Sequence, residues 1–118
     1  MRPLLPTHIE RPWGYFDEFI TNTPCTVKII TVNAGESLSL QYHMQRSEFW
    51  VILKGNGFVT IGDTKTEAHG GDRFHVDIHT NHRAEGGSEP LVFLEISTGN
   101  FDEDDIVRID DKYGRVSS

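Results

Sequence analysis

The chain has 118 residues, enough for one hydrophobic core and too few for two, because a domain typically takes roughly 100 to 150 residues. Its net charge of −7 repels phosphate backbones at long range, so we expect no nucleic-acid partner. Cys25 is the single cysteine, which excludes an intrachain disulfide and fits a reducing, cytoplasmic compartment. No segment has the ~20 apolar residues of a membrane span or the apolar core of a signal peptide, so we expect neither membrane insertion nor export.

Turn-forming residues recur at intervals of about eight to twelve residues, a spacing typical of an all-β sandwich or barrel. Between the turns lie short runs of β-branched and aromatic residues, which we predict to be strands: Thr26–Val32, Glu48–Leu53, Phe58–Ile61 and Leu91–Ile96. No window keeps apolar residues at helical spacing. We therefore predict an N-terminal arm over residues 1–10, a single β-barrel domain over 11–109 and a polar C-terminal tail over 110–118.

Three side chains with metal-binding chemistry follow one another at alternate positions in the first half of the chain. If Ser37–Gln45 is a strand, alternation places Gln41, His43 and Gln45 on one face. Residues two positions apart on a strand are about 6.6–6.8 Å apart. Their side chains can therefore converge on one ion, ~2.1 Å from each donor atom. Glu48 begins the next predicted strand and can fold back toward the same face.

A second histidine-containing segment, residues 71–85, would bring a late histidine to the same site from across the barrel. We take His82 from it, so the predicted ligands of one divalent metal ion are His43, Gln45, Glu48 and His82. Two imidazoles, a carboxylate and an amide oxygen suit zinc, manganese, iron, cobalt or nickel, and the set does not choose among them.

Further blocks of sequence surround these residues in a fixed order: Arg11-Pro-Trp-Gly14, Leu38-Ser-Leu-Gln41, Arg46-x-Glu48-x-Trp50, His82-Arg83, Glu103-Asp-Asp-Ile-Val-Arg108 and Tyr113-Gly-Arg115. Together with the glycine, histidine and glutamate spacing of the two segments, they resemble the cupin superfamily. More closely, they are similar to the C-terminal domain of type II mannose-6-phosphate isomerase/mannose-1-phosphate guanylyltransferase. The resemblance implies an all-β cupin fold, a double-stranded β-helix or jelly-roll barrel, over nearly the whole chain.

Two departures from that family occur at the expected site. The family usually carries His-x-His where this chain has His43-Met-Gln45, and Pro-x-Gly before the last histidine where this chain has Asp77-Ile-His79. The first departure replaces an imidazole by a carboxamide, whose oxygen is a ligand for hard or borderline ions.

The resemblance implies a metal-dependent isomerase that interconverts mannose 6-phosphate and fructose 6-phosphate through an enediol. In that reaction the metal polarises the carbonyl oxygen, and Glu48 or His79 moves the proton. Arg46 and Arg83 would hold the phosphate of the sugar, and Gln41 would hold a hydroxyl. Lys28 is a further candidate for the phosphate.

Two alternatives to an isomerase stay open. One is another cupin enzyme, such as a sugar-nucleotide or sugar-phosphate epimerase, or a dioxygenase if the metal is iron with open coordination positions. The other is a non-catalytic sugar- or metal-binding module. Guanylyl transfer by this chain is not expected, since nothing in it resembles the glycine-rich nucleotide-binding segment of the bifunctional relatives.

Three expectations concern the surroundings of the site. Leu38, Leu40 and Tyr42 would form an apolar face opposite the ligands, and a second subunit could cover it to make a homodimer. Trp50 is expected in the core. In the acidic run of residues 102–105, Asp104 or Asp105 is expected to pair with an arginine.

Overall fold

The computed structural model describes residues 5–99, 102 and 104–115, which form strands without any helix. The first sheet has two strands: β1 (Thr7–Arg11) and β2 (Gly14–Glu18). The second has four, in the spatial order β3 (Thr26–Val32), β10 (Leu91–Gly99), β5 (Arg46–Lys54) and β8 (Arg73–Val76). The third has five, in the order β11 (Val107–Asp110), β4 (Leu40–Tyr42), β9 (His82–Gly86), β6 (Asn56–Ile61) and β7 (Thr64–His69). The prediction of an all-β fold is confirmed.

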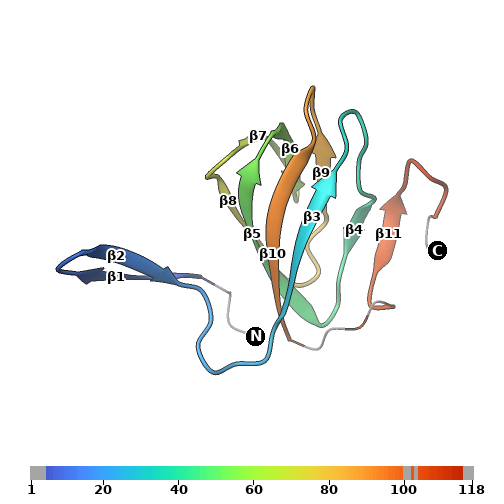
Figure 1. The fold of residues 1–118 in the computed structure, drawn as a ribbon. Coiled ribbons are helices and arrows are strands. Elements are labelled where there is room, and N and C mark those ends of the chain that lie inside the picture. The colour runs from blue at the N-terminus through green and yellow to red at the C-terminus, as the bar shows by residue number, and fades with distance from the viewer. Residues whose placement is uncertain (1–4, 100–101, 103, 116–118) are drawn as a thin grey trace.

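The two larger sheets enclose the hydrophobic core (Figure 1). All their paired strands are antiparallel. Trp50 of β5 is 1% exposed and lies with its ring centroid 4.5 Å from that of Phe93 on β10. Val59 of β6 and Ala84 of β9, both in the five-stranded sheet, belong to the same buried cluster as Trp50 and Phe93. The prediction that Trp50 belongs to the core is therefore confirmed.

The four runs predicted as strands all lie in strands, namely β3, β5, β6 and β10. The prediction of one strand over residues 37–45 is wrong. Only Leu40–Tyr42 is extended there, and Met44 and Gln45 form a bend before β5 begins at Arg46. The bend is needed because β4 belongs to the five-stranded sheet and β5 to the four-stranded sheet, so the chain must cross between sheets.

The hairpin of β1 and β2 extends away from the barrel (Figure 1). Arg73 of β8 holds its base, with Nη2 2.7 Å from Oδ2 of Asp17, and the ring of Phe19 lies 5.5 Å from that of Phe49. β1 begins at Thr7, inside the segment predicted as an arm. No described segment forms an apolar helix long enough to cross a membrane.

The last strand, β11, pairs with β4 and so brings Ile106 and Arg108 beside the predicted site. In this pairing Val107 lies opposite Tyr42, and Arg108 lies opposite Gln41. Leu38, just before β4, packs against the core, so it is not part of a free apolar face. The homodimer stays a prediction.

Candidate metal centre and adjoining pocket

Three buried side chains converge inside the barrel: His43, Glu48 and His82. His43 follows β4, Glu48 lies on β5 and His82 begins β9, so both larger sheets contribute. They are 2%, 2% and 1% exposed, and one donor atom from each lies within 4.8 Å of the other two. Three of the four predicted metal ligands are therefore gathered at one point.

Backbone carbonyl groups orient both imidazole rings. Nδ1 of His43 donates to the Asp105 carbonyl oxygen at 2.7 Å, and Nδ1 of His82 donates to the Thr80 carbonyl oxygen at 2.8 Å. Nε2 of each ring is then left facing the carboxylate of Glu48, at 3.3 Å for His43 and 3.8 Å for His82. Such hydrogen bonds fix the tautomer and ring orientation of metal-binding histidines in proteins generally.

The charge states of the cluster suit a metal ion. Burial lowers the pKa of His43 and of His82, and the negative charge of Glu48 opposes this only in part. Both rings are therefore neutral near pH 7, with a lone pair on Nε2. Glu48 accepts hydrogen bonds from Nε1 of Trp50 at 3.0 Å and from Nε of Arg46 at 3.2 Å.

The donor set fits a divalent cation. Nε2 of His82 is buried and has no hydrogen-bond partner among the described residues, which is costly unless a ligand takes its lone pair. Two imidazoles and one carboxylate are a set that protein-bound zinc and iron commonly use. Nε2 of His43 instead lies 3.4 Å from the Gln41 amide nitrogen and 3.3 Å from Nη2 of Arg46. Those two donors would turn aside when an ion binds.

A pocket of about 180 Å³ opens beside the cluster, and Gln41, Arg46 and Glu48 belong to its wall. Its described lining residues include four basic side chains: Lys28, Arg46, Arg108 and Arg115. Nε of Arg108 is buried and unpartnered among the described residues. In a chain with a net charge of −7, this local excess of cations is the feature that an anionic ligand needs.

Glu95, on β10, is a second buried carboxyl group in this pocket, with 7% of its surface exposed. Burial and, after it, the charge of Glu48 raise its pKa to about 7, although the positive charges of Lys28 and Arg46 oppose the rise in part. Oγ of Ser97 donates a hydrogen bond to it at 3.3 Å. Glu95 was not among the residues predicted from the sequence, although a carboxyl group between the apolar Leu94 and Ile96 of a predicted strand was a usable signal.

Three predicted site residues are not brought into the cluster. Gln45 lies in the exposed bend after β4, because that bend ends the alternation that put it on the same face as His43. The side chain of His79 is exposed, and only its backbone N–H reaches the site, where it donates to the His43 carbonyl oxygen at 2.7 Å. Arg83 donates through Nε to the Leu38 carbonyl oxygen at 3.0 Å and does not line the pocket.

Arg46 and Gln41 do lie where the sequence analysis expected them, beside the cluster. Arg108 and Arg115 were noted in the sequence only as parts of the family blocks and were not predicted as site residues. Their place in the pocket depends on the pairing of β11 with β4. Asp104 or Asp105 was expected to pair with an arginine. The carboxylate of Asp105 instead accepts hydrogen bonds from the backbone N–H groups of Met44 and Gln45 in the bend.

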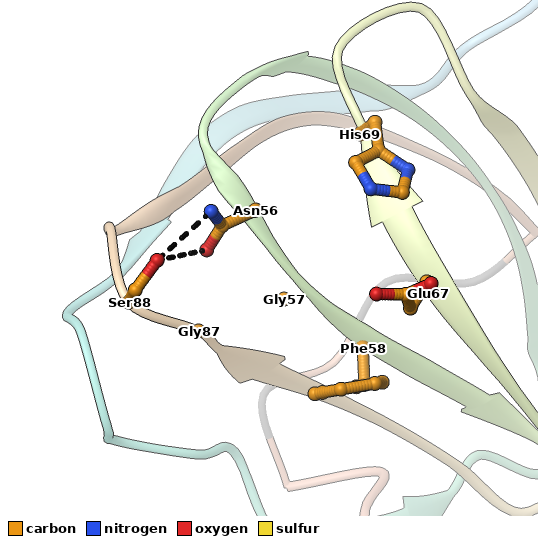
Figure 2. Close-up of a pocket in the computed structure, with 7 residues that line it drawn as sticks. All are labelled: Asn56, Gly57, Phe58, Glu67, His69, Gly87 and Ser88. Atoms are coloured by element: carbon orange, nitrogen blue, oxygen red, sulfur yellow. Dashed lines mark hydrogen bonds between the residues drawn. The ribbon is translucent and has the colours of Figure 1, made fainter.

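A second pocket, of about 220 Å³, lies between β6, β7 and the loop after β9 (Figure 2). Its residues are Asn56, Gly57, Phe58, Glu67, His69, Gly87 and Ser88. Figure 2 shows the Asn56 side chain turned toward Ser88, and its Nδ2 donates to the Ser88 hydroxyl at 3.1 Å. None of these residues belongs to the metal centre.

The chain resembles known proteins in sequence over most of its length. A family model described as mannose-6-phosphate isomerase C-terminal matches residues 4–111. The mannose-1-phosphate guanylyltransferase ManC of Salmonella typhimurium is 37% identical over 110 residues, which cover 92% of this chain and 23% of the relative. The mannose-1-phosphate guanylyltransferase of Escherichia coli K12 is 40% identical over 111 residues, with the same coverage. The chain thus spans about a quarter of the length of these enzymes.

Solved structures support the fold. A cupin protein from Bacteroides fragilis is 30% identical, with a TM-score of 0.61, and the match covers 65% of this chain and 67% of that one. A cupin-2 domain from Rhodospirillum rubrum, 23% identical, superposes with a TM-score of 0.63 over 72% of this chain and 58% of that one. The predicted cupin barrel is confirmed.

The predicted activity is wrong. The curated relatives are named for guanylyl transfer to mannose 1-phosphate or for xanthan and alginate biosynthesis, and not as isomerases. The interconversion of mannose 6-phosphate and fructose 6-phosphate was inferred from family resemblance. In addition, the side chains of Gln45, expected as a metal ligand, and of His79, expected to move the proton, are exposed and lie outside the cluster.

Proposed function

Since the chain belongs to the mannose-6-phosphate isomerase C-terminal family of cupin domains, we propose that it binds one divalent metal ion and a phosphorylated mannose side by side. His43, Glu48 and His82 would hold the ion, and the adjoining pocket would hold the sugar phosphate. The observation that carries the proposal is the placement of four basic side chains next to a buried His–Glu–His cluster in an acidic chain.

The phosphate would lie against Arg108, and Arg115, whose Nε and Nη2 donate to Asp111, would add positive charge beside it. Guanidinium groups bind phosphate oxygens through paired, charge-assisted hydrogen bonds, and the buried Nε of Arg108 has a donor to spare among the described residues. Lys28 adds a third positive charge on the same wall. The pocket volume of about 180 Å³ favours a small metabolite, since drug-sized ligands occupy roughly 300–1,000 Å³.

The sugar hydroxyls would face Gln41 and the cluster. The amide of Gln41 can both donate and accept, which suits a hydroxyl. A bound divalent ion would supply Lewis-acid polarisation of a ligand oxygen. Glu95, whose pKa burial raises to about 7, can donate a hydrogen bond to the ligand when protonated and accept one when ionised.

The ligand class comes from the names of the relatives, which are mannose-1-phosphate guanylyltransferases. This chain covers 23% of their length, so we assign it the binding of the metal ion and of mannose 1-phosphate, not the transfer of the guanylyl group. In this proposal the domain serves a guanylyltransferase as a metal-containing sugar-phosphate-binding unit.

Calorimetric titration of the metal-loaded protein with mannose 1-phosphate, and separately with mannose, tests the proposal. We expect one equivalent of metal and a clear preference for the phosphorylated sugar. Arg108→Gln should weaken binding of mannose 1-phosphate by about tenfold, the loss of roughly one charge-assisted hydrogen bond. Arg11→Gln, a matched change on the exposed hairpin, should leave it unchanged. Equal affinity for the two sugars, or a protein that retains no metal, would refute the proposal.

A further inference from the structure

Two described residues after β10, Asp102 and Asp105, contact side chains of the metal centre and its pocket. Although it lies about sixty residues later in the chain, Asp105 makes three hydrogen bonds to the bend between β4 and β5. Its carbonyl oxygen accepts from Nδ1 of His43 at 2.7 Å. Its two carboxylate oxygens accept from the backbone N–H of Met44 at 2.9 Å and of Gln45 at 3.0 Å.

We infer that Asp105 is a positioning residue for the metal ligand His43, because its carboxylate clamps the bend while its carbonyl oxygen orients the imidazole ring. The inference rests on the proposed metal centre and adds a residue that touches no metal. It also gives the acidic run after β10 a task that the pattern of charges alone did not reveal.

The bend lies between two strands of different sheets. Met44 and Gln45 are exposed and lie outside the strands, so the ladders of β4 and β5 do not hold their backbone. A carboxylate is the one side-chain group that can accept from two adjacent N–H groups through two oxygens at once. These bonds keep the Asp105 backbone next to the His43 ring.

The consequence for His43 is a single tautomer. With Nδ1–H donating to the carbonyl oxygen, the lone pair is on Nε2, the atom that faces Glu48 at 3.3 Å. Without the clamp the ring would be free to place its proton on either nitrogen or to rotate away from the cluster. Loss of such an outer hydrogen bond typically weakens metal binding about 10- to 100-fold.

The charge of Asp105 is maintained by the same contacts. Burial raises the pKa of its carboxyl group, but the hydrogen bonds from Met44 and Gln45 and the positive charge nearby, including that of Arg46, together bring the pKa below its ordinary value. Asp102, earlier in the segment, accepts a hydrogen bond on its carbonyl oxygen from Nη1 of Arg46 at 3.0 Å. The segment thus contacts two side chains of the site from one side.

The test compares Asp105→Ala, Asp105→Asn and the control Asp104→Asn, which removes the same charge one residue earlier. Calorimetry with Co²⁺ alone gives the metal affinity, and the visible spectrum of bound Co²⁺ reports its coordination. Long-range ¹H–¹⁵N spectra of the metal-free protein report the tautomer of His43. Thermal unfolding of the metal-free variants measures any purely structural effect.

We expect Asp105→Ala to weaken Co²⁺ binding at least tenfold and to give His43 a mixture of tautomers. Asp105→Asn, with a single acceptor oxygen, should lie between Ala and the wild type, and Asp104→Asn should match the wild type. A wild type without Co²⁺ binding refutes the metal proposal, and the tautomer spectra then decide the role of Asp105. If both Asp105 variants keep the wild-type tautomer and affinity, Asp105 is not a positioning residue.

Discussion

Glu95→Gln should make the metal-free protein more stable at alkaline pH. Burial raises the pKa of Glu95 from 4.5 to about 7, and one pKa unit corresponds to about 1.4 kcal/mol, so the shift amounts to about 3 kcal/mol. Because the folded-state pKa is raised, the protonated carboxyl is fully tolerated below pH 4.5, and stability is lost as the pH rises through 7. Glutamine has nearly the same shape, carries no charge and can still accept the hydrogen bond of Ser97.

The assay is urea unfolding of wild type and variant in the presence of a chelator, at pH 4.5 and pH 8. We expect equal free energies of unfolding at pH 4.5 and a variant that is more stable by up to about 3 kcal/mol at pH 8. The buried histidines titrate in both proteins, so their contribution cancels in the difference. Glu67→Gln, the same change on exposed β7, should alter stability by less than about 0.5 kcal/mol at either pH. A difference between Glu95→Gln and wild type that does not change with pH would refute the reasoning.

Three further predictions concern the barrel. Ile52→Ala, at a core position that is 1% exposed, should lower the free energy of unfolding by about 2–5 kcal/mol in urea denaturation. Gly57→Ala should reduce the yield of folded protein and the melting temperature, because the added Cβ would overlap the carbonyl oxygen of Glu85 on the paired strand β9. Hydrogen bonds from Arg115 lower the pKa of Asp111 to about 2, so its stabilising effect is present above pH ~4. The stability difference between wild type and Asp111→Asn should therefore shrink as the pH falls toward 2.

The strands were predictable where their residues are strongly β-forming and where sharp turns bound them. β3 was predicted to the residue, because Thr26–Val32 is rich in β-branched residues and lies between two turns. The stretch before β5 was not, since Leu40–Tyr42 has only one pairing with β9 and the chain then leaves that sheet. Local composition carries no information on which sheet a strand will join.

The same limit explains the outcome at the site. His43, Glu48 and His82 were predicted because each stands in a short motif whose spacing is visible in the chain. The prediction for Gln45 failed because the strand ends at Tyr42, and Gln45 lies in an exposed bend where strand alternation no longer applies. Arg108 and Asp105 could not be placed at all, because their positions depend on how β11 and the segment before it return to β4.

The interior of the barrel is divided between packing and binding, and Trp50 lies at the boundary. Its ring packs against Phe93 on one side, while its Nε1 donates to Glu48 at 3.0 Å and its edge meets His82 at a centroid distance of 5.7 Å. Nε2 of His82 is buried and unpartnered among the described residues, which reduces the stability of the metal-free protein. A ligand that binds only the folded state recovers that loss through mass action. In the proposed metal centre, the residues that lower the stability of the metal-free domain are therefore those that would bind the ion.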